Sequence, residues 1–371
     1  MKTRLTFFLI GFLYLNSFVN AQSAETKIQN VLDSIYTANP KSVGLMVHVE
    51  SPSNGISWSG ASGYSNKNSE SELEHDQPAL IASNIKPYVS ATILKLVEEN
   101  KLSIHQSVKT LLTDKTKELF QTRGYDLDSI AVKHLLSHTS GIQNYATQDY
   151  IDFISANKTY RWTRDEQLEL TIKQGAPLGN PGTVFNYSDA NYLLLTEIIE
   201  GIVKKPFHLA MRELLSYEAL GLNDTWMPTL EKKPRGTKSL VHQYWGEYNW
   251  DSYDIDISVD LYGGGGIACT THDLAIFTHK LFNSEIIKDT AVFNLIYTKI
   301  QTTDSTESNY YLGISSGEYS GYKGYGHTGF WGTAVEYFPA LNTTISVFVL
   351  DRDERKLRPE IINKILEILT D

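Results

Sequence analysis

The chain has 371 residues, of which 43 are acidic and 33 are basic, so its formal net charge at neutral pH is −10. This acidic balance argues against nucleic acid or an anionic membrane as a partner. The single cysteine, Cys269, excludes an internal disulfide, and no Cys/His cluster has the spacing of zinc ligands. No phosphate-binding or dinucleotide-binding glycine pattern is present, so neither a metal nor an organic cofactor is implied.

Residues 1–21 have the pattern of an export signal. Lys2 and Arg4 give a positive start, and the segment 5–15 is an almost unbroken apolar run followed by small residues up to Ala21. The run is too short to span a bilayer, so an uncleaved membrane anchor is the weaker interpretation. We therefore expect a periplasmic or secreted protein, residues 22–371, with no stable membrane insertion after cleavage.

The segment after the signal predicts a helix and then a hairpin. The helix is indicated by apolar residues at the spacing of one helix face, Ile28, Val31, Leu32 and Ile35, and it ends before Asn39-Pro40. Segments 43–49 and 56–64 read as strands that flank a turn at 52–55.

A loop then enters a long apolar helix at Ser83. Lys86 lies one turn on, on the same helix face, so its amine can touch the hydroxyl of Ser83, as a serine nucleophile and its base require. The helix N-terminus favours a neutral amine. The pattern S-x-x-K also occurs at Ser155 and Ser320, but only Ser83 opens a long buried helix, and an isolated match of this kind is more often a solvated pair.

From Ser103 to about Phe282 the pattern is mostly helical. Residues 132–136 read as a helix that ends on a glycine C-cap at Gly141, and we interpret His138 as structural. A Gly/Pro-rich loop then delivers Tyr187-Ser188-Asp189 to another apolar helix, for which Ser188 or Asp189 is a natural N-cap.

An aromatic segment follows, at residues 244–262. It either walls a binding cleft or forms a small core of its own under a long loop, and the sequence favours neither reading. The residues concerned are Tyr244, Trp245, Tyr248, Trp250, Tyr253 and Tyr262. The next helix starts near Thr270, in a loose capping box with Asp273.

The C-terminal third predicts strands at 310–314, 324–329, 333–338 and 344–350, and a final helix at 359–369. We therefore expect an α+β fold. Its antiparallel sheet is flanked by the N- and C-terminal helices and built from about 22–80 and 290–371. A mostly helical lobe, about 81–289, forms the other half, with the active site in the cleft between them.

Three short patterns stand in order along the chain: Ser83-x-x-Lys86, Tyr187-Ser188-Asp189 and His327-Thr328-Gly329. Together with their flanks they resemble the serine β-lactamase and penicillin-binding peptidase superfamily, in the branch of class C β-lactamases, D-alanyl-D-alanine carboxypeptidases and related esterases. The resemblance covers nearly the whole mature chain, and motifs in matching order are far more specific than any one alone.

The resemblance implies a role for each residue. Ser83 would be acylated, Lys86 would take its proton, and Tyr187 would relay protons with Lys86 and His327 as its cationic neighbours. The backbone N–H groups of Ser83 and Phe330 would form the oxyanion hole. Asp189, His327, Thr328, Gly329 and Phe330 would bind the substrate.

Two positions depart from the family pattern. Asp189 replaces an asparagine that donates a hydrogen bond to the substrate's amide, so it is either protonated, or paired with Lys86, or the amide is read differently. His327 replaces lysine, which resembles the carboxypeptidases and esterases more than class C β-lactamases. Tyr64-Ser65-Asn66 matches the second motif fully, but its place at the end of the hairpin indicates a surface turn.

We therefore expect an exported hydrolase, D-alanyl-D-alanine carboxypeptidase-like, that acts on cell-wall peptides through an acyl-enzyme at Ser83. β-Lactams, D-amino-acid peptides and small esters are alternative substrates of the same fold. A different class, a non-catalytic penicillin-binding sensor, is motivated by Asp189. The sequence does not indicate the oligomeric state.

Overall fold

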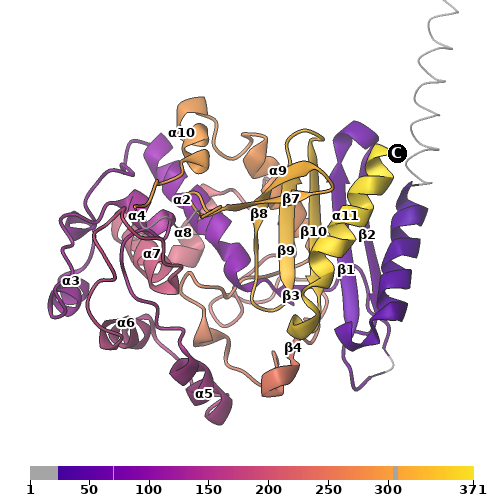
Figure 1. Cartoon of the computed structure of the whole chain (residues 1–371), viewed down its shortest axis with the longest axis horizontal. Coiled ribbons are helices and arrows are strands. Elements are labelled where there is room, and N and C mark those ends of the chain that lie inside the picture. Colours follow the sequence, from indigo (N-terminus) through magenta and orange to yellow (C-terminus); the bar gives the residue numbers. More distant parts are fainter. Residues whose placement is uncertain (1–23, 70, 304–307) are drawn as a thin grey trace, which may run out of the picture.

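The structure is a computed structural model, and it describes residues 24–69, 71–303 and 308–371. The predicted export signal, 1–21, lies outside these residues. Figure 1 shows a sheet with two helices on its outer face on one side of the molecule and a cluster of helices on the other. Among the described residues, no helix has both the length and the apolar character that a membrane span requires.

The sheet has six antiparallel strands in the order β2-β1-β10-β9-β8-β7. β1 and β10 pair along their whole length, with Val47 opposite Val347, so the two ends of the chain meet in one sheet as predicted. The strands are β1 (Gly44–Ser51), β2 (Ile56–Gly63), β7 (Ser315–Tyr319), β8 (Tyr322–Thr328), β9 (Thr333–Phe338) and β10 (Thr343–Val349).

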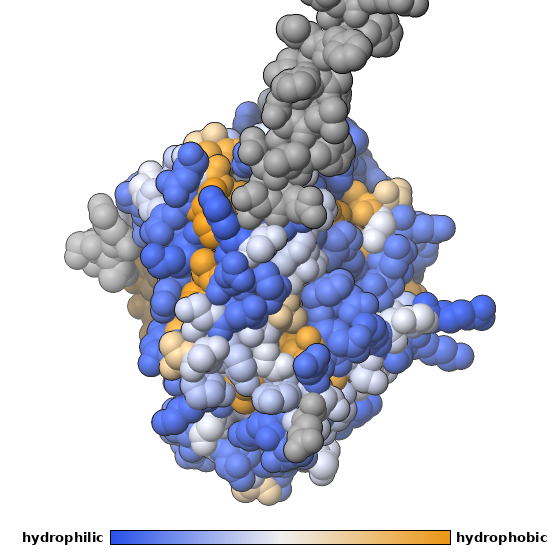
Figure 2. All heavy atoms as spheres, turned by 90° about the vertical axis from the view of Figure 1, so that its right-hand side faces the viewer, coloured by the Kyte–Doolittle hydropathy of each residue, from blue (hydrophilic) through white to orange (hydrophobic). Residues whose placement is uncertain are grey.

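The outer face of the sheet is covered by the helix at 24–38 and by α11 (Leu357–Thr370). The surface on this side of the molecule is mostly hydrophilic, with scattered hydrophobic residues (Figure 2). Alternate residues of β1 face opposite ways, as strand geometry requires: Leu45 and Val47 join the core under these two helices, and Met46 joins the core toward the helical lobe. Because burying one Leu or Ile contributes roughly 1.5–3 kcal/mol, this outer layer holds both chain ends firmly on the sheet. On the inner face, α9 (Thr271–Phe282) contacts β1, β9 and β10.

The helical lobe is arranged around α2 (Lys86–Glu98), which is preceded by a 3₁₀ turn, η3 (Ala82–Ile85). Helix α2 is buried along most of its length and packs against α7 (Asp189–Val203) and α8 (Phe207–Leu214). The remaining helices are α3 (Asp114–Gln121), α4 (Val132–Leu136), α5 (Gln148–Ala156), α6 (Arg164–Lys173) and α10 (Thr290–Asn294). Two-stranded ladders join β3 (Ala79–Leu80) to β6 (Ala268–Cys269) and β4 (Tyr244–Trp245) to β5 (Trp250–Asp251).

Two predictions about local structure are wrong. Residues 310–314 do not form a strand: Gly313 has a φ of 82°, and a Cβ there would lie 2.5 Å from the Cβ of Ser90, so the chain turns into the helical lobe and the strand begins at Ser315. Helix α4 ends at Leu136, and the left-handed residue that follows its end is His138, with a φ of 58°, rather than the predicted Gly141. The left-handed conformation of His138 is held because its ring is buried and accepts a hydrogen bond from the backbone N–H of Ser188.

Candidate active site

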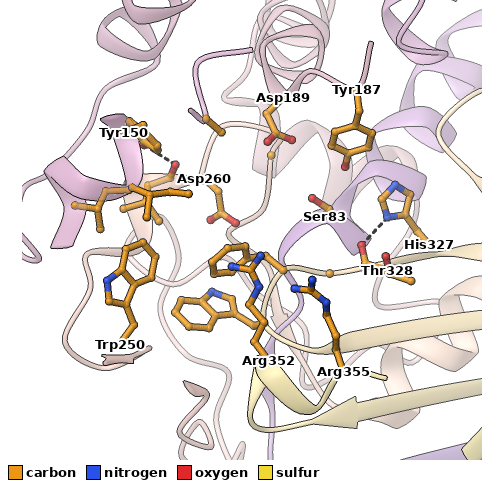
Figure 3. A pocket seen from close by; sticks show the side chains of 18 of the residues that line it. Ser83, Tyr150, Tyr187, Asp189, Trp250, Asp260, His327, Thr328, Arg352 and Arg355 are labelled. Atoms are coloured by element: carbon orange, nitrogen blue, oxygen red, sulfur yellow. Dashed lines mark hydrogen bonds between the residues drawn. The ribbon is translucent and has the colours of Figure 1, made fainter. Parts of the chain in front are cut away.

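The turn that leads into α2 brings Ser83 and Lys86 into contact. The Nζ atom of Lys86 lies 2.9 Å from the Oγ of Ser83, Lys86 is fully buried, and Ser83 is partly exposed at a pocket between the two lobes (Figure 3). The other two S-x-x-K serines lie elsewhere, Ser155 on α5 and Ser320 in the turn between β7 and β8. Only Ser83 has the contact that a nucleophile needs.

Lys86 is an ammonium group with all three of its N–H bonds in use. Besides Ser83, it donates to Oδ1 of Asp189 at 2.7 Å and to the carbonyl of Gly264 at 3.2 Å. Burial lowers the pKa of Lys86, but Asp189 and Tyr187 outweigh burial and raise it to about 12. The prediction of a neutral amine is therefore wrong, because the carboxylate that keeps the amine charged comes from the start of α7. Of the three readings of Asp189, pairing with Lys86 is the one observed.

Tyr187 lies near Ser83 and precedes the first residue of α7 by two positions. The Nζ of Lys86 is 5.0 Å from the centroid of its ring. Burial raises the pKa of Tyr187, and the charge of Lys86 lowers it in part, so the phenol stays protonated at neutral pH. The ring stacks on His138 with centroids 4.2 Å apart, and His138 in turn accepts from the Ser188 N–H. His138 thus positions Tyr187 from behind, in a structural role.

The third motif lies at the end of β8, where His327 is buried and neutral. Its Nδ1 donates to the carbonyl of Thr328 at 2.8 Å, so its Nε2 accepts from the hydroxyl of Tyr310 at 3.0 Å. Burial and the charge of Lys86 lower the pKa of His327 to about 3. His327 therefore supplies no positive charge to Tyr187, contrary to prediction, and both of its nitrogens are bonded to protein groups. Thr328, by contrast, is exposed in the pocket.

Gly329 lets the turn after β8 approach the nucleophile. A Cβ at this position would lie 2.2 Å from the carbonyl oxygen of Ile81 and 2.2 Å from the Oγ1 of Thr333, so only glycine fits. Hydrogen bonds stabilise the same contact: the hydroxyl of Thr333 donates to the carbonyl of Ile81, and the side-chain amide of Asn84 donates to the hydroxyl of Thr333 at 2.8 Å. The backbone of Phe330 is thereby brought to the pocket beside Ser83.

The pocket has a volume of about 510 Å³. Besides the motif residues, its walls include aromatic and apolar side chains, among them Trp250 of the aromatic segment. Trp245 lies behind Trp250 and is buried, whereas Tyr253 is 53% exposed. Trp250 lines the cleft, as the first interpretation predicted. The segment does not form a small core of its own, because Tyr244 and Trp245 join the main hydrophobic core of the helical lobe.

Several residues that line the pocket were not identified from the sequence. Arg352, Arg355 and Arg358 reach the pocket from the chain that follows β10. The Cζ atom of Arg352 lies 3.8 Å from the ring centroids of both Trp245 and Phe330, and its buried Nε and Nη1 have no hydrogen-bond partner in the described part of the chain. The available signal was three arginines within seven residues of an acidic chain. Tyr145, Tyr150 and Asp260 line the pocket as well, and no sequence pattern marked them.

Residues 41–369 match the family model described as Beta-lactamase. The chain belongs to this family. Among curated relatives, it is 27% identical to the N-acetylmuramyl-L-alanine amidase of Bacillus subtilis (81% of this chain, 75% of the relative) and 25% identical to a putative D-alanyl-D-alanine carboxypeptidase of Escherichia coli (71% and 67%). Its fold matches that of a D-amino acid amidase from Ochrobactrum anthropi SV3, with a TM-score of 0.77, 19% identity, and coverage of 94% of this chain and 99% of that one.

These findings identify the protein as a serine hydrolase of the β-lactamase and penicillin-binding protein fold. The predicted fold class is confirmed, with its antiparallel sheet and many helices. In the part of the chain that the structure describes, no group of three or more His, Cys, Asp or Glu side chains is arranged to hold a metal ion.

Proposed function

We propose that this protein is an exported serine hydrolase that removes the last residue of D-alanyl-D-alanine-type peptides, with cell-wall peptides as their source, through an acyl-enzyme on Ser83. The observation that carries the proposal is the convergence of Ser83, Lys86 and Tyr187 at a pocket that three arginines also line. The likeness to curated carboxypeptidases supports the same substrate class. Export rests on the signal at 1–21.

In the acylation step, Tyr187 acts as the proton relay. The Ser83 oxygen attacks the peptide carbonyl while its proton passes to the Tyr187 oxygen, and the phenolic proton of Tyr187 passes to the leaving nitrogen. Tyr187 thus begins and ends as a neutral phenol. Lys86 stays an ammonium throughout and stabilises negative charge that develops on the two oxygens, because the Lys86 pKa of about 12 makes loss of its proton costly at neutral pH.

Two backbone N–H groups complete the machinery. Those of Ser83 and Phe330 would bind the oxyanion of the tetrahedral intermediate, and Gly329 permits the close approach that such a pair requires. Deacylation follows the same path in reverse, with water in place of the leaving amine and Tyr187 accepting its proton.

The arginines would bind the substrate's terminal carboxylate. Arg352 lines the pocket, and its guanidinium packs against the rings of Trp245 and Phe330, which are nearly perpendicular to each other. These contacts hold the guanidinium in place, so it is positioned to bind a carboxylate at little entropic cost. Since both nitrogens of His327 already bond to protein groups, Thr328 and the arginines take over the anchoring that the family motif implied for His327.

A substrate panel tests this function. Purified protein and its Ser83→Ala variant are assayed with N-acetylated D-Ala-D-Ala and D-Ala-D-Ala peptides, nitrocefin and p-nitrophenyl esters. We expect release of D-alanine that is lost in Ser83→Ala and reduced in Arg352→Ala through a higher KM. Turnover of nitrocefin or esters without D-alanine release would show that the substrate is a β-lactam or an ester and not the proposed peptide. A stable penicillin adduct without turnover of any substrate would indicate a sensor.

A further inference from the structure

Asp260 is an acid in the active-site pocket that lacks a basic partner. The other pocket acid, Asp189, pairs with Lys86, but no ion pair joins Asp260 to a basic side chain of residues 24–69, 71–303 and 308–371. No side-chain donor of these residues hydrogen-bonds its carboxylate either. In Figure 3 the carboxylate points into the cavity, on the side of Asp189. An acid in this position is open to a ligand.

The loop that carries Asp260 is held rigidly. The carbonyl of the preceding residue, Val259, accepts hydrogen bonds from Tyr150 at 2.7 Å and from Gln167 at 2.9 Å. On the other side the chain returns very close by: a Cβ on Gly265 would lie 2.1 Å from the Oδ2 of Asp260. The carboxylate is therefore fixed in the pocket wall before any ligand binds, as a specificity site requires.

A second unpaired polar group faces the same space. Tyr145 lines the pocket and is 1% exposed, and its buried hydroxyl has no hydrogen-bond partner among the residues that the structure describes. Burial and the nearby Asp189 and Asp260 raise the pKa of Tyr145, so the phenol stays neutral and can accept a hydrogen bond. Burial and Asp189 also raise the pKa of Asp260 to about 7, against the opposing charge of Lys86. Among the described residues, an acid without a basic partner and a buried hydroxyl without a donor therefore line one pocket, and a cationic donor suits both.

We propose that Asp260 and Tyr145 bind the α-ammonium group of the substrate's acyl half. An ammonium has three N–H donors and would satisfy both groups at once. Asp260 lines the same pocket as Ser83 and lies on the side of Asp189 (Figure 3), so an ammonium bound to Asp260 shares the pocket with the reacting carbonyl. Ile151, Ile154 and Trp250 line the same pocket and offer an apolar wall for the amino-acid side chain.

This inference rests on the proposed function and narrows it. With an ammonium at Asp260 and a carboxylate at Arg352, the pocket fits short peptides with a free amino terminus, such as a dipeptide, better than N-acylated wall stems. Amides of single amino acids have the ammonium group that Asp260 would bind, but they lack the carboxylate that Arg352 would bind.

The test compares an unblocked with a blocked acyl donor. D-Phenylalanine p-nitroanilide and its N-acetyl form are assayed on the wild type, Asp260→Asn, Tyr145→Phe and the matched control Asp254→Asn, an exposed acid of the same segment. We expect the wild type to prefer the unblocked substrate at least tenfold in kcat/KM. Asp260→Asn should lower this preference at least tenfold and Tyr145→Phe severalfold, whereas Asp254→Asn should keep it.

Two further measurements distinguish failure of the ammonium site from failure of the proposed hydrolase function. Labelling of Ser83 by a fluorophosphonate and the melting temperature are recorded for every variant. If Ser83 is labelled but the wild type shows no preference for the unblocked substrate, or both pocket variants keep the full preference, the ammonium site is refuted while the proposed hydrolase stands. If Ser83 is not labelled in the wild type, the proposed function itself fails. Should Asp260→Asn fail to fold, the wild-type preference and Tyr145→Phe decide the question.

Discussion

Replacing Asp189 by asparagine should speed amide hydrolysis. The carboxylate of Asp189 holds Lys86 as a charged partner and also raises the pKa of Tyr187, the proposed proton relay. Asparagine keeps an acceptor oxygen for the lysine but removes the negative charge, so the net charge around the relay rises by one. An ammonium without its counter-charge better stabilises the negative charge that develops on the Tyr187 oxygen as its phenolic proton passes to the leaving nitrogen.

The size of the effect follows from the contact that is lost. A hydrogen bond to a charged group contributes about 1.5–3 kcal/mol, which corresponds to roughly 1–2 pKa units on Lys86 and a smaller fall on Tyr187. Because a less basic relay is also a weaker acceptor, only about half of this gain appears in the rate. We expect kcat/KM for an amide substrate to rise roughly 3- to 10-fold, and the alkaline limb of its pH profile to move to lower pH.

The assay is D-alanine release from pH 5 to 10 by the wild type, Asp189→Asn and the control Asp165→Asn, which removes the carboxylate of an exposed Lys–Asp pair. The control should match the wild type. The melting temperature of Asp189→Asn should fall by a few degrees, because a buried lysine loses its counter-charge. An unchanged or lower kcat/KM, in a variant that is folded and still labelled at Ser83, would refute this reasoning and assign the carboxylate a positive role.

Three further substitutions test other parts of the site. Tyr187→Phe should lower kcat/KM by about 10²- to 10⁴-fold with little change in melting temperature, whereas normal kinetics would remove Tyr187 as the relay. Gly329→Ala should lower kcat/KM at least tenfold, because its Cβ would clash with Ile81 and Thr333; an unimpaired variant would show that the turn can move freely. Burial raises the pKa of Glu336 to about 8, so the folded state keeps a proton that the unfolded chain releases near pH 4.5, and stability falls as pH rises between these values. Glu336→Gln should flatten this fall in melting scans from pH 5 to 9, and equal slopes would contradict the pKa.

Much of the framework was predictable because it follows local periodicity. β9 has the bounds predicted for it, 333–338, and the helix at 24–38 ends before Asn39 as expected. The strand predicted at 310–314 failed for a reason that no local pattern contains: Gly313 packs against Ser90 of a helix far away in the sequence.

The same limit applies to the active site. The spacing of Ser83 and Lys86 predicted their contact, but the charge of Lys86 depends on Asp189, which lies 103 positions away in the chain. Asp260 and Arg352 lie outside the regular helices and strands of the sheet and lobe, where periodicity gives no signal, so only the folded chain reveals that they share a pocket.

The central requirement of the proposed mechanism is that the Oγ of Ser83 is the nucleophile. Intact-protein mass spectrometry after brief exposure to a fluorophosphonate, followed by peptide mapping, tests it directly. We expect one adduct per chain, located on Ser83, absent in Ser83→Ala and slowed in Lys86→Ala. An adduct on another serine, or equal labelling of Ser83→Ala, would contradict the chemistry proposed for this pocket.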